Sequence, residues 1–536
     1  MTPKKIFLHI KSLLLDKNEK DFIKLTKEKV SKNQIIKKNL LIEIQADYYH
    51  LCYYKSIYQD RFKEYNIYGY WPDFLHVNTK TNNFIYKFYK KYKAEIYFYF
   101  VRKKWEKLYQ AIGVKEVFSF QDLQKKYVDS LDKKKAIENS KKIFKKLKNK
   151  RDVLNICIKS INCGDLIYDS YIRYRNEPTV DINDYFLEDL ILKSILLTDA
   201  AKKFVNEKNF NNYYTGYTSY INHGLLCRFF LKFGVNVYSD ANYQYNKKLS
   251  IKDNTTAENF RLFKNKFKKL KNKHMKLNLS KKMIQSYFSA RPTKSKLYYY
   301  MHKNPYKTMG YDLSILKRNN IKGVVFLPNF FESQRYWGDS VFVDLYEWMI
   351  STLEIIRKNK LNIALKPHPN IYSDNYSGLM QAHESIKVFE ELKRKYSDLI
   401  WLDHHVSNKE IFNNIKFGVS PWGSVLWEIA YHGKVAISAG MHPAKYYNIS
   451  YDPINENDYQ KLLINAHLLK KKKYLLNDIY EFCYMLMIRE EDNYKTIARK
   501  IQLKKNVPLV RVKDSQNLIK FLKLYKDYIK TNLKSL

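Results

Sequence analysis

The sequence predicts an α/β fold made of two doubly wound domains that face each other across a cleft. It has 536 residues, of which 45% are hydrophobic. A single core rarely grows past about 250–300 residues, so a chain of this length is expected to form two main domains. In both halves, apolar runs of strand length alternate with helix-length stretches, which is typical of parallel sheets with crossover helices.

Residues 1–246 are predicted to form the first α/β domain. Its expected strands are short apolar runs, and its expected helices are longer amphipathic stretches, one of them closed by Gly113. The expected strands are Leu40–Gln45, Glu95–Phe100, Val153–Ile158 and Val235–Tyr238. The expected helices are Lys103–Ile112, Lys133–Arg151, Leu187–Phe204 and Gly224–Phe233.

Residues 247–320 are lysine-rich and almost free of glycine, which indicates a helical linker. The second α/β domain is expected over 321–480, and C-terminal helices over 481–536. Its expected strands are Gly323–Pro328, Asn362–Lys366, Leu399–Leu402, Phe417–Val419 and Val435–Ile437. Its expected helices are Val341–Lys358, Ser385–Lys395, Asn408–Asn414 and Val425–Tyr431.

The chain is strongly basic, with 97 Lys and Arg against 53 Asp and Glu and a net charge of +44. Such a field attracts polyanions, which include nucleic acid, anionic lipid head groups and phosphorylated substrates. A solvated lysine-rich surface explains the same composition. The lysine clusters are not part of a recognisable nucleic-acid-binding module, so no specific nucleic acid is expected.

Cysteine usage and hydropathy predict a cytoplasmic protein. The five cysteines are odd in number and form no CxxC pair, which argues against a zinc site or a disulfide framework. The apolar stretch at the N-terminus is too short and too interrupted for a signal peptide. No run of about 18 apolar residues exists, so membrane contact is expected to be peripheral at most, at the inner face of the cytoplasmic membrane.

The segment SPWGSVLWEIAYHGK, Ser420–Lys434, combines a Gly-Ser turn with a helical carboxylate. Gly423 and Ser424 follow a strand and open a helix, where backbone N–H groups and a hydroxyl can meet a phosphate. Glu428 lies four residues on, on the same helix face, and can accept hydrogen bonds from a ribose diol. The plain alternative is a serine N-cap with an exposed glutamate.

The segment ALKPHPN, Ala364–Asn370, places Lys366 and His368 at the end of a strand. The prolines on both sides of His368 restrict the loop and hold the imidazole at the carboxyl end of the sheet, where ligands bind in open α/β folds. A lysine and a histidine at this point can neutralise a diphosphate.

Together, KPHP, the GS turn, the helical glutamate and HGK resemble the C-terminal donor domain of GT-B enzymes that build capsules and related surface polymers. These enzymes include the capsule-linker Kdo transferases and, more distantly, the CDP-glycerol glycerophosphotransferases. The resemblance implies two Rossmann-like domains. It also implies that His368 and Ser424 contact the donor phosphates and that Glu428 contacts the sugar of the nucleotide.

Two segments of the first half resemble bacterial surface-carbohydrate biosynthesis proteins. CGDLIYDSYIRYRNEPTV, Cys163–Val180, is similar to their GDLIYDxYLR segment, and Tyr217–Tyr238 is similar to an element on their acceptor side. The implied activity is sugar transfer from a nucleotide-sugar donor to a capsule or lipid-linked glycan acceptor.

The same resemblance implies metal-independent catalysis without a cofactor. No convincing DxD motif stands in a strand-end loop, and the adjacent His404 and His405 do not share a helix face, which argues against a metal site. Two more residues are expected at the donor: Arg335 to meet phosphate, and Trp337 to stack on a base or sugar or else to anchor the loop. The expected donor-binding residues are Lys366, His368, Gly423, Ser424, Glu428, Arg335 and Trp337.

An inverting transferase needs a general base for the acceptor hydroxyl. His223, beside Gly224 at an expected helix start, is one candidate, and Asp165 and Asp169 are two others. Helix capping explains the two aspartates equally well.

Two other functions fit the sequence. A CDP-glycerol-type polyol-phosphate transferase would share the fold and the GS turn. A non-catalytic basic protein that binds nucleic acid or membrane would explain the charge alone.

Overall fold

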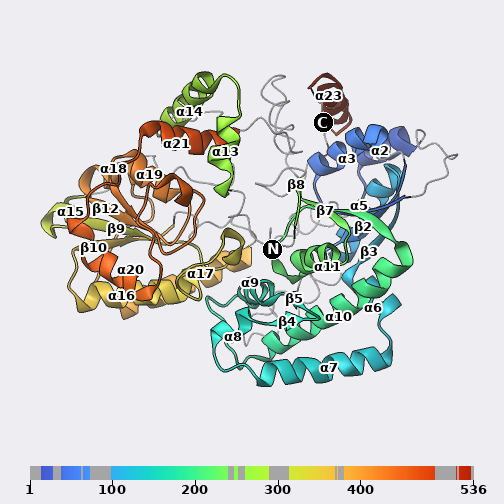
Figure 1. The fold of residues 1–536 in the computed structure, drawn as a ribbon, viewed down its shortest axis with the longest axis horizontal. Helices are drawn as coiled ribbons and strands as arrows, with labels where there is room; N and C mark the ends of the chain where they lie inside the picture. Colours follow the sequence, from blue (N-terminus) through green and yellow to red (C-terminus); the bar gives the residue numbers. More distant parts are fainter. Residues whose placement is uncertain are drawn as a thin grey trace.

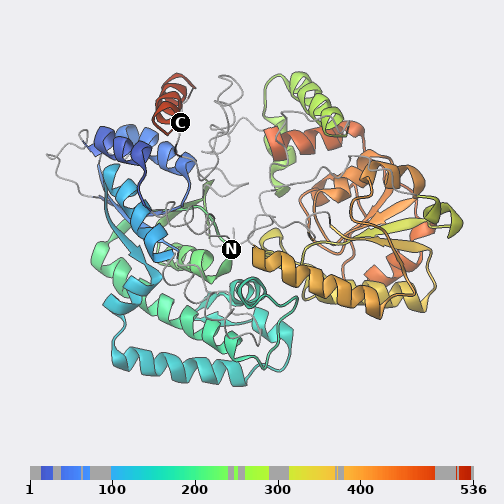
Figure 2. The ribbon, with the colours of Figure 1, turned by 180° about the vertical axis from the view of Figure 1, so that it is seen from behind.

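The computed structural model describes most of the chain. The described residues are 14–27, 38–61, 64–72, 98–239, 247–250, 260–288, 313–368, 371, 379–488, 515 and 518–532. They form two α/β lobes that lie side by side, the first at the right of Figure 1 and the second at the left. Figure 2 shows the same arrangement from behind.

The first lobe is built on a six-stranded sheet of order β3-β2-β1-β6-β7-β8, parallel except at β8. The chain runs outward from β1 through β2 to β3, then returns to the other side of β1 at β6. The strand order therefore reverses between β1 and β6, where α/β sheets bind their ligands. The strands are β1 (Lys38–Glu43), β2 (Tyr65–Trp71), β3 (Val114–Ser119), β6 (Phe210–Thr215), β7 (Asn236–Ser239) and β8 (Lys247–Lys248).

The second lobe is built on a five-stranded, fully parallel sheet of order β11-β10-β9-β12-β13. Its strand order reverses between β9 and β12. Strands buried on both faces read as continuous apolar runs, which is why the sequence located them closely. The strands are β9 (Gly323–Phe326), β10 (Ile363–Lys366), β11 (Ile400–Trp401), β12 (Phe417–Val419) and β13 (Val435–Ile437). The two sheets confirm the predicted α/β class with two Rossmann-like domains.

Helices cover the faces of both sheets (Figure 1). Those of the first lobe are α2 (Lys17–Lys27), α3 (Tyr48–Arg61), α5 (Phe98–Ala111), α6 (Phe120–Tyr127), α7 (Ser130–Lys145), α8 (Lys150–Leu154), α9 (Gly164–Arg175), α10 (Tyr185–Lys208), the π-helical turn η2 (Tyr220–Leu225) and α11 (Leu226–Lys232). Those of the second lobe are α15 (Ser314–Arg318), η3 (Arg335–Trp337), α16 (Leu345–Lys358), α17 (Leu379–Lys395), α18 (Asn408–Asn414), α19 (Val425–Tyr431), η4 (Lys445–Tyr447), α20 (Glu456–Ile464) and η5 (Ala466–Leu468).

Two predicted strands of the first domain are wrong. In Glu95–Phe100, the described residues Phe98–Phe100 begin helix α5, which buries Trp105, Leu108 and Tyr109 on one face. In Val153–Ile158, Val153 belongs to α8, which Asn149 caps, and only Cys157 and Ile158 form β4, paired with β5 (Ile161–Asn162). Helical periodicity and a capping box override the strand propensity of these short apolar runs.

Helices from outside the two expected domains pack onto both lobes. The last described helix, α23 (Leu518–Asn532), lies on α3, where Phe521 packs against Tyr49. In the expected linker, α13 (Phe263–Lys268) and α14 (Lys273–Phe288) pack with α21 (Leu476–Cys483) and η6 (Tyr484–Ile488) beside the second sheet. β8, at the start of that segment, joins the first sheet instead.

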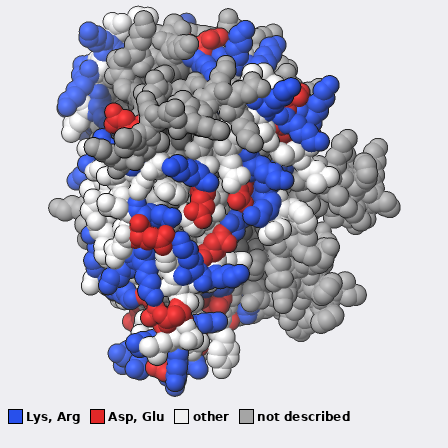
Figure 3. All heavy atoms as spheres, turned by 90° about the vertical axis from the view of Figure 1, so that its right-hand side faces the viewer, with Lys and Arg blue, Asp and Glu red and all other residues white. Residues whose placement is uncertain are grey.

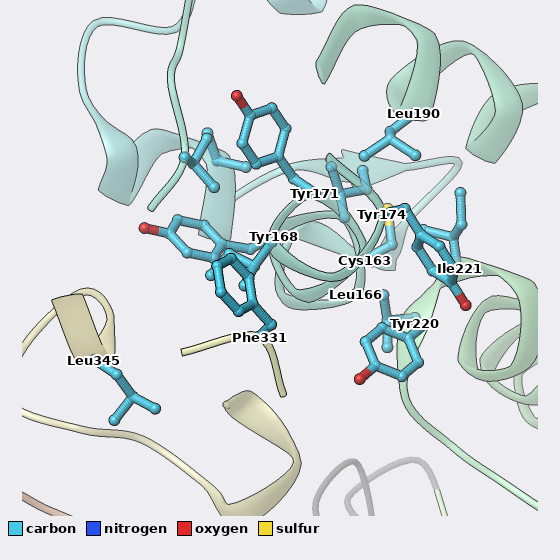
Figure 4. Close-up of a cluster of buried hydrophobic side chains, with 14 of the residues drawn as sticks. Cys163, Leu166, Tyr168, Tyr171, Tyr174, Leu190, Tyr220, Ile221, Phe331 and Leu345 are labelled. Carbon is cyan, nitrogen blue, oxygen red and sulfur yellow. The ribbon is translucent and has the colours of Figure 1, made fainter. Parts of the chain in front are cut away.

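The two lobes share a continuous core around helix α9. Tyr168, Tyr171 and Ile172 of α9 belong to the same buried cluster as Phe331 and Leu345 of the second lobe. Figure 4 shows Phe331 beside Tyr168. The Tyr168 hydroxyl also donates to Asp344 at 2.6 Å. Helix α9 therefore fixes the loop that follows β9 against the first lobe.

Basic and acidic side chains are mixed on the face of the molecule that Figure 3 shows. On the face in Figure 3, Lys and Arg occur across the described area with Asp and Glu among them. Among the residues that the structure describes, every helix is too short or too polar to span a bilayer.

Candidate functional site

Lys366, the last residue of β10, is a buried cation at the carboxyl end of the second sheet. The residue is 2% exposed, and neither a hydrogen bond nor an ion pair within 4.0 Å involves its ammonium in the described chain. Burial lowers the pKa of Lys366 to about 8, although the charges of Glu428 and Asp403 oppose that shift. Burying an ammonium that forms no ion pair costs folding free energy, and such a group is typical of a site that binds an anion.

His368 lies two residues after Lys366 and is partly buried. Burial, helped by the positive charge of Lys366, lowers the pKa of His368 to about 4. The imidazole is therefore neutral at pH 7 and can offer a hydrogen bond rather than a positive charge. The sequence predicted that Lys366 and His368 would both carry a positive charge at a diphosphate. In the structure a charged His368 would be repelled by Lys366, so only Lys366 carries a positive charge at pH 7. Pro369 lies outside the described residues.

Glu428 of α19 faces the same region as Lys366. Its side chain is 2% exposed, and its Oε1 accepts a hydrogen bond from the Tyr287 hydroxyl at 3.2 Å. Tyr287 comes from α14, so the expected linker contributes a contact to this site. The structure thus brings Glu428 near Lys366 and, through Lys366, near His368. We call Lys366, His368 and Glu428 the second-lobe cluster.

The GS turn lies at the expected place, between β12 and α19. Gly423 has a φ of +102°, which disfavours any residue with a Cβ, and it is exposed. Ser420 fixes the turn because its hydroxyl donates to the carbonyl of Trp422 at 2.9 Å and of Phe326 at 3.2 Å. The Ser424 side chain makes no capping hydrogen bond, so the N-cap explanation does not account for it.

Asp403, His404 and His405 form a turn after β11, close enough to Lys366 for the Asp403 charge to act on it. Asp403 Oδ1 accepts from the backbone N–H of His405 at 2.7 Å and lies 3.0 Å from its Nδ1. Ligand atoms of the three residues lie within 4.8 Å of one another. Because the three residues lie in a turn that brings their ligand atoms together, the lack of a shared helix face does not argue against a metal site here. The Asp403 hydrogen bonds account for the turn without an ion, and metal-independent catalysis stays a prediction.

Arg335 lies at the contact between the two lobes. Its guanidinium donates to the carbonyl of Val343 and lies 3.8 Å from Asp339 Oδ1. Its backbone N–H donates to Asp169 Oδ2 at 3.2 Å. A phosphate at Arg335, as the sequence predicted, would therefore have to compete with Val343 and Asp339 for the guanidinium. Trp337 ends η3, and its side chain lies outside the described residues.

The two aspartates expected as bases or caps both make structural contacts. Asp169 of α9 is 2% exposed and accepts backbone N–H groups of Gln334 and Arg335 from the other lobe. Asp165, also on α9, forms a two-pronged ion pair with Arg228 at 2.5 and 2.6 Å. Neither carboxylate is available to an acceptor hydroxyl in this arrangement, and neither caps α9, whose N-cap is Cys163.

His223 lies in the π-helical turn η2, next to the point where the first sheet reverses its strand order. Its Nδ1 is 3.0 Å from Glu43 Oε1, and its ring is 17% exposed. Glu43 ends β1, and its Oε2 accepts from the Thr215 hydroxyl at the end of β6, at 2.9 Å. Single π-helical turns are frequent at functional sites. η2 also begins at Tyr220, a bulky residue with a φ of +61°, the kind of strain that clusters at such sites.

The loop after β9 links the His223 region to the second lobe. Tyr217 packs edge-on against the His223 ring at 5.5 Å and stacks on Tyr336 of η3 at 5.5 Å. Its hydroxyl lies 3.3 Å from the Ser333 hydroxyl. Sequence reasoning did not identify Glu43, Thr215 or Tyr287. The position of Glu43 at the end of the expected strand Leu40–Gln45 was the one available signal.

No family model and no curated protein matches the chain. Among solved structures, it is similar to a co-structure of S. aureus MnaA with UDP at 8% identity. That alignment covers 88% of this chain and 97% of the other, with a TM-score of 0.23. A similarity of this size carries no argument about function. The assignment of two Rossmann-like sheets rests instead on the strand order and directions described above.

Proposed function

We propose that the protein is a glycosyltransferase that moves a sugar from a nucleotide-sugar donor to a surface-polysaccharide acceptor, either a capsule chain or a lipid-linked glycan. The main support is Lys366, a buried lysine at the carboxyl end of a parallel strand, close to Glu428 and followed by His368. Its ammonium forms no ion pair within the described residues. A cation beside a carboxylate suits a ligand that carries phosphate and hydroxyl groups at neighbouring positions.

The chemistry of sugar transfer accounts for each member of the second-lobe cluster. As the nucleotide departs, negative charge develops on its phosphate oxygens, and a preorganised cation stabilises that charge. Lys366 supplies it from a buried position, where a charge interaction is stronger than in bulk water. The neutral His368 donates a hydrogen bond to the same group, and Glu428 accepts hydrogen bonds from a sugar hydroxyl of the donor.

The proposal includes metal-independent catalysis without a cofactor, in the cytoplasm, with the basic surface resting on the anionic inner face of the membrane. A lipid-linked acceptor would make such docking useful. The sequence resemblance of KPHP and of the GS turn supports a transferase over a non-catalytic basic protein. A polyol-phosphate transferase would share the GS turn, so a comparison of sugar donors with CDP-glycerol separates those two activities.

A thermal-shift screen tests the proposal. The protein is incubated with CMP-, UDP-, GDP- and CDP-linked sugars and, separately, with CDP-glycerol. A ligand at one hundred times its Kd stabilises the folded state by about 2.7 kcal/mol, so one sugar donor should raise the melting temperature. Lys366→Met should abolish that rise, and Lys358→Met, at an exposed lysine, should not.

Three outcomes of this screen would overturn the proposal. A rise with CDP-glycerol alone identifies a polyol-phosphate transferase. The absence of a rise with every nucleotide, together with salt-sensitive RNA or vesicle binding, identifies a basic binding protein. A donor-induced rise that Lys366→Met leaves unchanged places the donor elsewhere.

A further inference from the structure

His223 and Glu43 form a pair that can accept a proton. Glu43 is buried, with 1% of its side chain exposed, and its two carboxylate oxygens have different partners. Oε1 meets His223 Nδ1 at 3.0 Å, and Oε2 accepts from the Tyr213 hydroxyl at 3.4 Å. Oε2 also lies 2.9 Å from the Thr215 hydroxyl, whose one proton it shares with the Tyr217 carbonyl at 2.7 Å. The carboxylate is thus held between the ends of β1 and β6, so the orientation of the imidazole is fixed by the sheet itself.

This geometry determines the tautomer of His223. A carboxylate can only accept a hydrogen bond, so the proton of the neutral imidazole lies on Nδ1 and the lone pair lies on Nε2. Nε2 makes no hydrogen bond in the described chain and is absent from its buried polar atoms that lack a partner. The basic nitrogen is therefore open to solvent. A base within reach of solvent and oriented by a third group is the arrangement that activates hydroxyl nucleophiles.

We propose that His223 is the general base for the acceptor hydroxyl, that Glu43 is its positioning residue, and that transfer inverts the anomeric centre. This inference rests on the proposed function. The location supports it, because the pair lies at the strand-order reversal of the first sheet, and Tyr217 connects it to Tyr336 in the loop that leaves β9 of the second lobe.

The step balances without a further reactant. Nε2 takes the proton of the acceptor hydroxyl while the acceptor oxygen forms a bond to the anomeric carbon of the donor. The bond from that carbon to the phosphate oxygen breaks, and its electron pair leaves with the nucleotide. The imidazolium, stabilised by Glu43, then releases its proton to water. One displacement on the face opposite the leaving group inverts the configuration.

The test compares transfer by His223→Ala, Glu43→Gln and two control variants, with a donor that the thermal-shift screen has identified. His223→Ala is expected to lower kcat by about 10²–10⁴-fold, the usual contribution of a general base. Added imidazole should restore part of that activity, which loss of a merely structural ring would not allow. His467→Ala, at an exposed histidine of η5, is the matched control and should transfer at the wild-type rate.

Glu43→Gln keeps the size of the side chain but removes the charge that selects the tautomer. It is expected to lower kcat at least about tenfold with an unchanged KM for the donor. Glu207→Gln, at an exposed glutamate, is its control. Thr215→Val, which removes one of the two hydroxyls at Glu43 Oε2, should give a smaller loss of the same kind. Melting temperatures identify any variant that fails to fold, and proton NMR of the wild-type product gives its anomeric configuration independently.

The outcomes separate this inference from the proposed function. If the wild type binds no nucleotide sugar, the proposed function fails. If the wild type transfers sugar and His223→Ala is as fast, or imidazole restores nothing to a folded and impaired variant, the base assignment is overturned. Retention of the donor's anomeric configuration in the product contradicts single displacement and overturns it as well.

Discussion

The carboxyl group of Asp169 in the first lobe accepts the backbone N–H of Arg335 in the second lobe at 3.2 Å. It also accepts the N–H of Gln334 at 3.1 Å, so one buried side chain satisfies two donors of the loop that follows β9. This loop carries Tyr336, which stacks on Tyr217 beside His223. The contact between the lobes and the candidate base therefore depend on the same short segment.

Replacing Asp169 should loosen this segment. Asp169→Ala leaves the buried N–H of Arg335 and the partly buried N–H of Gln334 without this acceptor, which costs about 1–3 kcal/mol of unfolding free energy. Asp169→Asn keeps one acceptor oxygen and should cost less. Urea denaturation of both variants measures the difference, and an Asp169→Ala protein as stable as the wild type would show that these hydrogen bonds contribute nothing.

Asp169 also predicts a pH effect. Burial, together with the nearby Asp165 and against the charge of Arg335, raises the pKa of Asp169 to about 8. In the unfolded chain it is near 4, so between pH 4 and 8 the folded state binds more protons. Stability from this group is thus complete below about pH 4 and is lost as the pH rises to about 8. Asp169→Asn should lack that decline when melting temperatures are compared across the range.

Lys366→Met should make the free protein more stable. Burial holds the pKa of Lys366 near 8, well below the unfolded value of 10.5, so its charge opposes folding at neutral pH. A methionine of similar length should add about 1–2 kcal/mol at pH 7. Between pH 8 and 10.5 the folded wild type binds fewer protons than its unfolded chain, so its stability increases with pH. The difference in stability between the variant and the wild type should therefore shrink as the pH rises. Urea denaturation at pH 7 and pH 10 checks both expectations, and a destabilised variant would contradict them.

Asp452 should be important for the stability of the second lobe. It accepts from Ser438 and Ser450 at 2.7 Å each and meets His442 Nε2 at 3.0 Å, and His442 is fully buried. Asp452→Ala leaves these groups without their acceptor and should cost about 3 kcal/mol. Asp398→Ala, which removes the exposed ion pair with Arg357, should cost less than about 1 kcal/mol in the same denaturation experiment.

The Asp452 contacts also predict that the protein loses stability at acidic pH. Burial alone would raise the pKa of Asp452, but the hydrogen bonds from His442 and the serines outweigh it and hold the pKa below 3.8. The stability that this group supplies is present above about pH 4 and is lost as the pH falls through the folded value. Below pH 4 the wild type should therefore lose stability faster than Asp452→Ala. Equal acid sensitivity would contradict the assignment.

Gly224→Ala should displace the turn that carries His223. A Cβ at this position would collide with the backbone carbonyl of Thr218 and lie 2.7 Å from Leu166 Cδ2. The required shift should cost about 1–3 kcal/mol and should lower kcat more than it changes donor affinity. Denaturation and transfer assays measure the two effects. Wild-type kcat in this variant would mean that His223 does not need this placement.

The sequence predicted the second lobe more closely than the first. The strands β9, β10 and β12 are short apolar runs buried on both faces, and their limits match the expected ones to within a few residues. Strands β2 and β6 carry tyrosine and asparagine and lack that signal, so they were missed. Polar strands are stabilised by neighbours far away in the chain, which a local pattern does not contain.

The site shows the same division. Glu428 and Lys366 were expected from local motifs, and the structure places them close together. Asp165 and Asp169 look alike in sequence, four residues apart on one helix, yet one pairs with Arg228 and the other with the backbone of the second lobe. Glu43 looks like an ordinary strand-end residue in the sequence, because its partners Thr215 and His223 lie 172 and 180 residues further along the chain.

Calorimetric titration of the wild type and Lys366→Met with the preferred nucleotide at pH 8.5 tests the central claim, that Lys366 meets the donor phosphate. Two buffers with different ionisation enthalpies give the number of protons taken up. A phosphate beside Lys366 should raise its pKa from about 8, so the wild type should take up a fraction of a proton and the variant should bind weakly without uptake. Equal affinity and equal proton uptake in both proteins would contradict the claim.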